Sequence, residues 1–135
     1  MEINDIIIRA EKETDRETIH NLVDRIRKTD EYIPELTLAA VYADKIIGHI
    51  MMSKVYVRDQ IGLALASLAV LPESQRSGVG RSLVKEAHKR AMKQGYGFSV
   101  VLGYPGYYSR FGYTAASEFG IKPTFEAPDE YFMVC

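Results

Sequence analysis

A glycine-rich segment is the part of this sequence best suited to chemistry. The apolar run Leu68–Leu71 leads through Pro72 into the pattern Gln75-x-x-Gly78-x-Gly80, and a helix is predicted directly afterwards. Glycines at a helix start leave backbone N–H groups open to an anion, and the helix dipole adds to the attraction. The spacing therefore predicts a cradle for a diphosphate group. Its members are Gln75, Arg76, Ser77, Gly78, Val79, Gly80, Arg81 and Ser82.

The glycines have one simpler explanation, and two other phosphate-binding loops can be excluded. They could simply let the chain turn, since a bare Gly-x-Gly is a weak signal. Two common phosphate loops do not fit. A P-loop requires Gly-Lys-Ser/Thr, whereas Gly80 precedes Arg81. A dinucleotide fingerprint requires a third small residue, and that position holds Leu83.

A second segment, residues 103–113, concentrates tyrosines and a phenylalanine. It reads Gly-Tyr-Pro-Gly-Tyr-Tyr-Ser-Arg-Phe-Gly-Tyr. Aromatic clusters usually pack in a core. This one, however, follows the apolar run Phe98–Leu102, and open sheets place their ligands at the carboxyl ends of parallel strands. The segment is therefore a candidate to face a ligand.

These motifs need a sheet and a helix to position them. The apolar patterns predict an α/β (α+β) chain with one mixed sheet, in the order β-α-β-β-β-α-β-α-β-β. Because a predicted helix connects the strand Leu63–Leu71 to the strand Phe98–Leu102, these two strands should run parallel. The expected strands are Asp5–Arg9, Leu36–Tyr42, Ile46–Val57, Leu63–Leu71, Phe98–Leu102, one from Tyr113 onward and Tyr131–Val134. The expected helices are one that begins at Thr14 or Asp15 and one over Gly80–Gln94, and Tyr104–Arg110 is expected to be a short turn or helix.

Composition excludes several classes of function. The 135 residues suit a single domain, 1–135, and the formal net charge of −1 offers no basic field for nucleic acid. The one cysteine, Cys135, excludes a disulfide framework, and the three scattered histidines predict no metal site. No signal segment or membrane-spanning run is visible, so we expect a cytoplasmic protein without a membrane partner.

Together the two motifs resemble the GNAT superfamily of acetyl-CoA-dependent N-acetyltransferases, and in particular a bacterial branch of predicted acetyltransferases. The resemblance rests on Leu-Ala-Val-Leu-Pro-Glu-x-Gln-x-x-Gly-x-Gly at 68–80 and on Tyr-Tyr-Ser-Arg-Phe-Gly-Tyr at 107–113; residues 32–36 also fit. It implies the GNAT fold, a mostly antiparallel sheet with one splayed parallel strand pair and helices on both faces.

The resemblance also implies roles for individual residues. The cradle would hold the diphosphate of acetyl-CoA, the co-substrate, and the pantetheine arm would pair with Leu68, Ala69 and Val70. A backbone N–H of Leu68 or Ala69 would polarise the thioester carbonyl. Tyr108 matches the family's general-acid tyrosine and would protonate the departing thiolate, with Tyr107 as the weaker candidate.

The acceptor and the general base are less defined. The resemblance implies direct attack by a primary amine of an unknown small molecule or peptide. Many members carry a Glu on the strand before the cradle, but 63–70 holds no carboxylate. Ser67, Glu73, Glu35 and His49 are the residues that we consider in its place.

That missing carboxylate leaves a second function open. The chain could be an acyl-CoA-binding sensor or interaction module with weak or no catalysis. Compared with the resembling family the chain also ends early, at Cys135, so we expect either a short member or a lost tail. Members of the family often form homodimers, and the resemblance extends that expectation to this chain.

Overall fold

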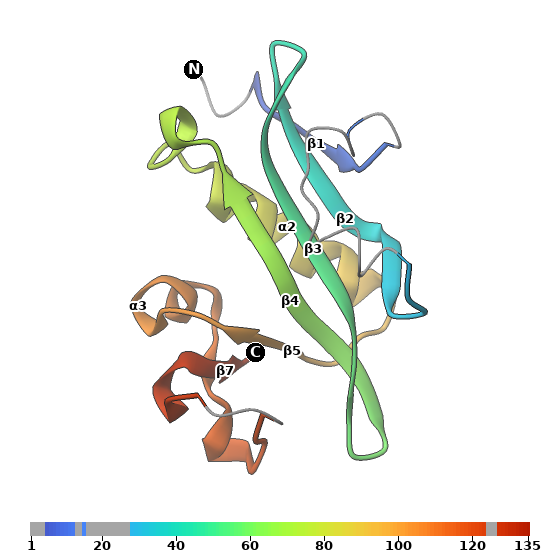
Figure 1. Ribbon diagram of the computed structural model, residues 1–135, viewed down its shortest axis with the longest axis vertical. Coiled ribbons are helices and arrows are strands. Elements are labelled where there is room, and N and C mark those ends of the chain that lie inside the picture. Colours follow the sequence, from blue (N-terminus) through green and yellow to red (C-terminus); the bar gives the residue numbers. More distant parts are fainter. Residues whose placement is uncertain (1–4, 13–14, 16–27, 124–126) are drawn as a thin grey trace.

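The computed structural model describes residues 5–12, 15, 28–123 and 127–135. They form a seven-stranded sheet in the order β1-β2-β3-β4-β5-β7-β6 (Figure 1). The strands are β1 (Ile7–Ala10), β2 (Tyr32–Tyr42), β3 (Lys45–Val57), β4 (Gln60–Val70), β5 (Ser99–Leu102), β6 (Thr114–Ala115) and β7 (Phe132–Val134). The helices are α2 (Val79–Lys93), α3 (Pro105–Tyr108) and the short 3-10 turns η3 (Pro72–Ser74), η4 (Ser109–Phe111), η5 (Ala116–Phe119) and η6 (Asp129–Tyr131).

Two tight hairpins build the antiparallel half of the sheet. Strands β2 and β3 are joined by Ala43 and Asp44, both with positive φ, and β3 and β4 by Arg58, at φ 55°, and Asp59. Two-residue connections of this kind favour positive φ because the turn then matches the twist of the strands. The pairing of β3 with β4 shifts by one residue between Met51 and Met52.

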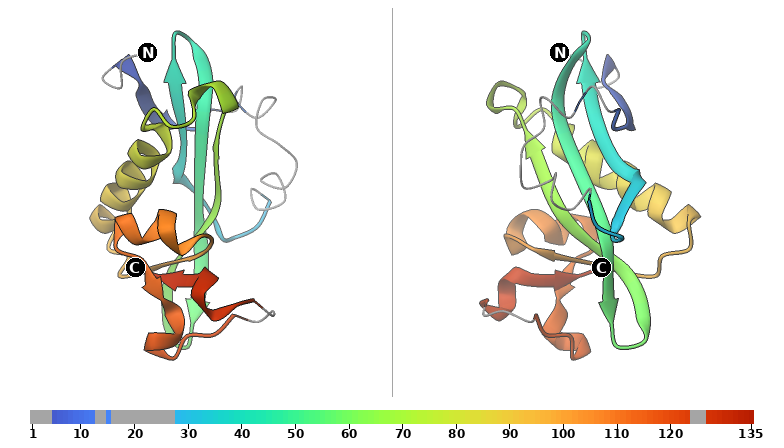
Figure 2. Two further views of the ribbon diagram at one scale, coloured as in Figure 1. Left: turned by 90° about the vertical axis from the view of Figure 1, so that its left-hand side faces the viewer. Right: turned by 45° about the vertical axis from the view of Figure 1, so that its right-hand side comes forward.

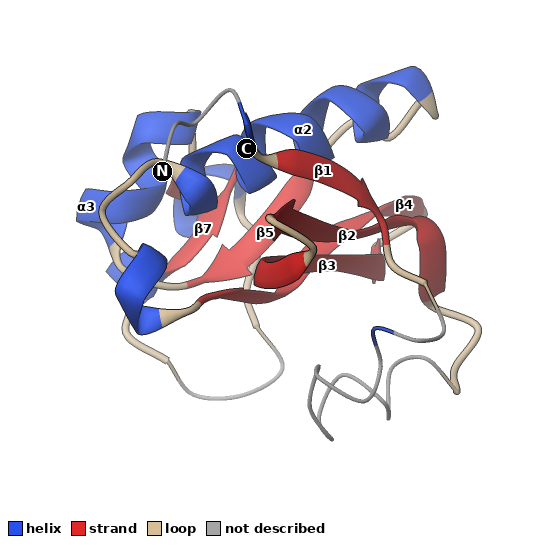
Figure 3. Cartoon of the chain, turned by 90° about the horizontal axis from the view of Figure 1, so that it is seen from above, coloured by secondary structure: helices blue, strands red, loops and turns tan. Residues whose placement is uncertain are grey.

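Helix α2 covers one face of this sheet, as the side view and the view from above show (Figures 2 and 3). Its apolar side buries Leu83, Val84 and Ala87 against strands β2 and β3. Gly48 of β3 permits the close approach, because a Cβ there would stand only 3.0 Å from atoms of both Leu83 and Val79. The helix start is thereby fixed against the middle of the sheet.

Strands β4 and β5 form the parallel pair that the sequence predicts, and the pair is short. Leu63 is opposite Ser99 and Ala64 is opposite Val100, with no further pair between these strands. Beyond Ala64, β4 continues to Val70, whereas β5 is held on its other side by β7. The two strands therefore separate toward their carboxyl ends, as Figure 1 shows.

Several predicted boundaries are wrong in ways that have a physical reason. The second strand is expected to start at Leu36, but β2 starts at Tyr32, which pairs with Ser53 before the register shifts ahead of Thr37. Exposed Pro34 lies in this irregular stretch, where the lack of an N–H breaks no regular pairing. Strand β4 starts at Gln60 rather than Leu63, because the turn before it takes only two residues.

The sheet ends in two short strands, β6 and β7, whose order differs from their order in the chain. The strand expected from Tyr113 onward is only Thr114–Ala115, and β7 lies between it and β5. The helix expected from Thr14 or Asp15 falls mostly outside the described residues. Among the helices that the structure does describe, none is long and apolar enough to cross a membrane.

Candidate active site

The start of α2 presents the backbone geometry that an anion cradle needs. Gly78 is the N-cap with φ 88°, and no side chain caps the helix. The first intrahelical hydrogen bond runs from the N–H of Ser82 to the carbonyl of Gly78, at 3.0 Å. The N–H groups of the preceding turn have no intrahelical acceptor, as at any helix start. They face outward at the positive end of a 15-residue helix.

The rest of the predicted cradle lies in the turn between η3 and α2. The Gln75 side chain is directed back toward β4, where its Nε2 donates to the carbonyl of Val70 at 3.1 Å. Arg76 adopts a left-handed conformation at φ 65° and is exposed, as is Arg81. The Ser77 hydroxyl donates to the carbonyl of Ser74. Two cations thus flank the bare helix start.

The alternation of hydrogen bonds along β4 identifies which of its peptide groups face the gap. The N–H of Leu71 donates to the carbonyl of Ile47 at 2.9 Å. Because hydrogen-bonded pairs alternate in an antiparallel ladder, Ala69 also faces β3, and Leu68 and Val70 point the other way, toward the separated β5. Of the two predicted amides, Leu68 is therefore the one directed into the gap.

Two adjacent tyrosines connect the end of β5 with the start of α2. The Tyr108 ring packs over Gly103, where a Cβ would be 2.3 Å from its Cε2 atom. The Tyr107 hydroxyl lies 2.6 Å from the position of a Cβ on Gly80. The two rings meet edge to face at a centroid distance of 5.0 Å. Tyr108, the predicted general acid, thus lies beside the end of β5, and Tyr107 covers the first turn of α2.

The environment of these tyrosines keeps their hydroxyls protonated. Burial raises the pKa of Tyr108, and the neighbouring Tyr107 raises it further. Burial also raises the pKa of Tyr107, and Arg110, whose guanidinium carbon is 5.7 Å from the Tyr107 ring centroid, opposes this. A hydroxyl that holds its proton at neutral pH can donate a hydrogen bond to a developing anion.

The residues considered in place of the missing carboxylate are spread over the molecule. Glu73 is exposed and lies 3.3 Å from Lys45; its pKa is lowered by a hydrogen bond from its own backbone and by Lys45. Glu35 is exposed on β2. Ser67 of β4 pairs with Met51 on the sheet face opposite α2. Neither Glu73 nor Glu35 is buried near the gap.

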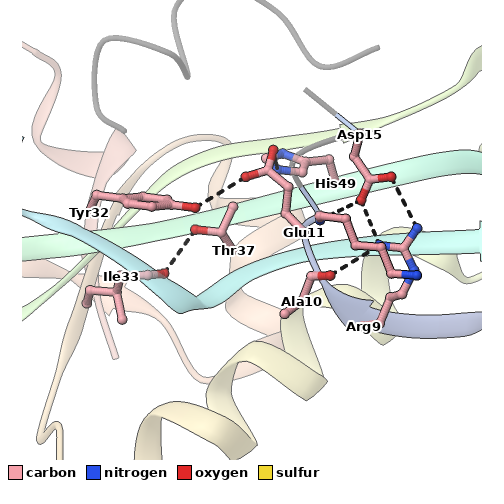
Figure 4. Close-up of polar contacts among 9 residues, drawn as sticks. Arg9, Ala10, Glu11, Asp15, Tyr32, Ile33, Thr37 and His49 are labelled. Carbon is pink, nitrogen blue, oxygen red and sulfur yellow. Dashed lines mark hydrogen bonds and ion pairs between the residues drawn. The ribbon is translucent and has the colours of Figure 1, made fainter. Parts of the chain in front are cut away.

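His49 has a carboxylate partner that the sequence did not reveal. It is buried on β3, directly across from Ala69, and its Nε2 lies 3.6 Å from Glu11 Oε1. The Glu11 side chain has no exposed surface and accepts a hydrogen bond from the Tyr32 hydroxyl at 3.4 Å (Figure 4). A carboxylate just beyond the first predicted strand was the only available signal for this contact. The cluster lies on the face of the sheet opposite α2.

An ion pair beside this cluster anchors the end of β1. Arg9 contacts both carboxylate oxygens of Asp15, at 2.6 and 3.2 Å, and the N–H of Lys12 donates to the same group at 2.8 Å (Figure 4). The hydrogen bond from Arg9 is the main cause that lowers the pKa of Asp15. Arg9 and Lys12, on either side of Glu11, are therefore both bound to Asp15.

Comparison with known families gives a match over most of the chain. Residues 4–113 match the model of the acetyltransferase (GNAT) family. Two similar curated proteins come from Escherichia coli (strain K12). The uncharacterized N-acetyltransferase YhbS is 32% identical over 137 residues, covering 96% of this chain and 77% of YhbS. The uncharacterized N-acetyltransferase YjhQ is 30% identical over 116 residues, and the aligned part is 82% of this chain but only 64% of YjhQ.

Solved structures confirm the expected fold. The crystal structure of Escherichia coli YhbS in complex with CoA has a TM-score of 0.89 at 26% identity, covering 96% of this chain and 79% of YhbS. A GNAT family acetyltransferase from Brucella melitensis in complex with acetyl-CoA has a TM-score of 0.73 at 25% identity, covering 96% and 86%. The mixed sheet and its flanking helices thus belong to the fold of these acetyltransferases.

Proposed function

Because the chain belongs to the acetyltransferase (GNAT) family, we propose that it transfers an acetyl group from acetyl-CoA to a primary amine by direct attack. One observation carries the proposal: β4 parts from β5 after Ala64 and then leads, through η3, to a helix start with unsatisfied N–H groups. An extended arm with a diphosphate at one end fits this sequence of features. The CoA and acetyl-CoA complexes of the two structural neighbours support the assignment.

The diphosphate would be bound by N–H groups at 78–81, with Arg76 and Arg81 adding positive charge. The pantetheine arm would pair with the Val70 N–H and the Leu68 carbonyl, because the Val70 carbonyl already accepts a hydrogen bond from Gln75. The Leu68 N–H would then donate to the thioester carbonyl oxygen and stabilise the negative charge that develops on it. Ala69, whose peptide groups face β3, would contribute only its small side chain to this wall.

The chemistry requires two proton movements. The amine nitrogen attacks the thioester carbon, a C–N bond forms, and the C–S bond breaks to release a thiolate. Tyr108 would give the thiolate a proton, since its buried hydroxyl is a donor at neutral pH. The proton lost by the amine would pass, through water, to His49, which lies across from Ala69 and is backed by Glu11.

The alternative function is a CoA-binding sensor without efficient catalysis. It is favoured by one observation, the absence of a carboxylate on β4 between Leu63 and Val70. A sensor would bind CoA as tightly as the enzyme does but release no thiol with any amine. The enzyme should release free CoA thiol in an acceptor-dependent reaction.

The deciding experiment combines CoA binding by calorimetry with thiol release against a panel of amines. The Gly80→Ala variant should weaken CoA binding, because its methyl group stands at the first turn of α2 and displaces Tyr107. Gly97→Ala is a matched control, since a Cβ at Gly97 meets nothing within 4 Å. Equal CoA affinity in both variants would contradict the cradle. Gly78 is a poorer choice, because its φ of 88° makes any side chain strain the turn itself.

A further inference from the structure

A cavity of about 460 Å³ adjoins the gap between the parallel strands. Ala64 and Val100, the last β4–β5 pair, both line it, and so do Leu65 and Val101, the next residues along the two strands that separate there. Its volume falls in the range of small-molecule sites, about 300–1,000 Å³. Because the cavity lies beside the gap in which the thioester would be bound, an acceptor in the cavity would be next to the thioester.

The walls of the cavity are apolar, and the charges that border it are all positive. Val55, Ile121 and Phe132 contribute apolar surface, and the charged residues are Arg58 and Lys122. Within the part of the chain that the structure describes, its lining includes no acidic side chain. Such a pocket disfavours a polyamine, whose second cation would meet Arg58 or Lys122, and favours an anion at that end.

The Arg58 guanidinium is held in the wall by its surroundings. Its Nη2 lies 3.3 Å from the position that a Cβ on Gly120 would take, so the group rests on the main chain of the loop after η5. Neither Arg58 nor Lys122 forms an ion pair with any residue in the described ranges. Both charges are therefore available to a ligand.

These cations cannot serve the same CoA molecule that the cradle would bind. Arg58 precedes β4 and the cradle follows it, so the two lie at opposite ends of an 11-residue strand. Gln60 and Leu68 alone are about 26 Å apart along an extended strand. After the reach of the Arg58 side chain is subtracted, an amine near Leu68 and an anion at Arg58 would be separated by roughly 15–20 Å.

We infer that the acceptor is an elongated, largely apolar primary amine with an anionic group at its far end, which Arg58 and Lys122 bind. The inference rests on the proposed function and names the substrate class of the same site. Two kinds of molecule share this chemistry: an aliphatic ω-amino acid and the amino terminus of a peptide with an acidic residue several positions along.

The test is calorimetric binding to the CoA complex of the full chain, which does not depend on turnover. The probes are ω-aminododecanoic acid and its uncharged amide, and a pentapeptide amide with apolar residues and a final Glu against the same peptide with Gln. We expect the acid of at least one pair to bind about 5- to 10-fold tighter than its neutral partner. The pair that shows the difference identifies the source.

Variants then assign the preference to the cavity. Arg58→Gln and Lys122→Gln should each reduce the preference for the acid, whereas Lys93→Gln, an exposed charge at the end of α2, should leave it unchanged. Equal binding of acid and neutral probes, no binding of either, or a preference that survives both substitutions would overturn the inference. Thiol release with the same probes separates the two proposals: turnover without charge preference keeps the acetyltransferase and rejects the acceptor class.

Discussion

The hydroxyl of Tyr107 lies over Gly80, 2.6 Å from the point where a side chain at that position would begin. Only glycine allows this contact, because a Cβ 2.6 Å from the hydroxyl would overlap it, whereas the next nearest atoms, Val70 Cγ2 and Tyr107 Cζ, are at ordinary contact distances of 3.6 and 3.9 Å. The absence of a Cβ at Gly80 thus serves the packing of Tyr107 as well as the openness of the helix start. The two roles can be separated by mutation.

Gly80→Ala should therefore lower the free energy of unfolding more in the wild-type protein than in the Tyr107→Phe variant, which lacks the hydroxyl. We expect a coupling free energy of about 1 kcal/mol between the two substitutions, measured by urea unfolding in a double-mutant cycle. CoA affinity should fall in both backgrounds, since the methyl group stays at the helix start. Additive unfolding free energies would show that Tyr107 does not contact Gly80.

Tyr108→Phe should lower kcat by roughly 10- to 100-fold and leave CoA affinity unchanged, because only proton donation to the thiolate is lost. Tyr107→Phe is the matched control on the neighbouring residue. Since burial raises the pKa of Tyr108, ionisation of this hydroxyl should not reduce the rate below pH 10. A kcat equal to that of the wild type would limit Tyr108 to packing over Gly103.

His49→Gln should slow the reaction more for a strongly basic amine than for a weakly basic one. An alkylamine with a pKa near 10.4 is protonated at neutral pH and has to lose a proton, whereas hydroxylamine is already neutral. We expect about a 10-fold loss of kcat/KM with the alkylamine and little change with hydroxylamine. A uniform loss with both amines would indicate that the Glu11–His49 contact only stabilises the fold.

The elements around the predicted cradle were accessible from sequence because their signals are local. The apolar stretch, Pro72 and the two glycines set where β4 ends and α2 begins, and the predicted helix start differs from the observed one by a single residue. The parallel pairing of β4 with β5 followed from the intervening helix, through the handedness of such crossovers. The conformation of Arg76, by contrast, has no sequence signature, because a non-glycine residue rarely adopts φ 65°.

Contacts between distant segments could not be predicted from local sequence signals. The insertion of β7 between β5 and β6 depends on pairing of Val134 with both Val100 and Thr114, which no local pattern specifies. The Glu11–His49 contact joins residues 38 positions apart, one just after β1 and the other on β3, and each residue looks ordinary in its own segment. Single-sequence periodicity reveals faces of elements, but it does not reveal which faces meet.

Asp15→Asn should destabilise the protein by about 1 kcal/mol at pH 7, since it weakens a hydrogen-bonded ion pair at the end of β1. Arg9 lowers the pKa of Asp15 in the folded state, so the pair's contribution is present above the ordinary carboxyl pKa and is lost as the pH falls through the folded value. Urea unfolding of both proteins should therefore show the difference shrinking below about pH 4. A difference that is independent of pH would contradict the ion pair.

The His88–Tyr113–Ser99 chain should make the protein less stable in mild acid. Tyr113 Oη lies 2.9 Å from His88 Nε2 and 2.7 Å from Ser99 Oγ, and burial lowers the pKa of His88 below its usual 6.5. The unfolded chain then binds a proton more readily than the folded one, so stability falls as the pH drops below 6.5 and levels off beneath the folded pKa. His88→Gln should remove this part of the slope, at most about 1.4 kcal/mol per pH unit. Urea unfolding of the two proteins between pH 7.5 and pH 5 measures it, and parallel curves over that interval would show that His88 titrates alike in the folded and unfolded chains.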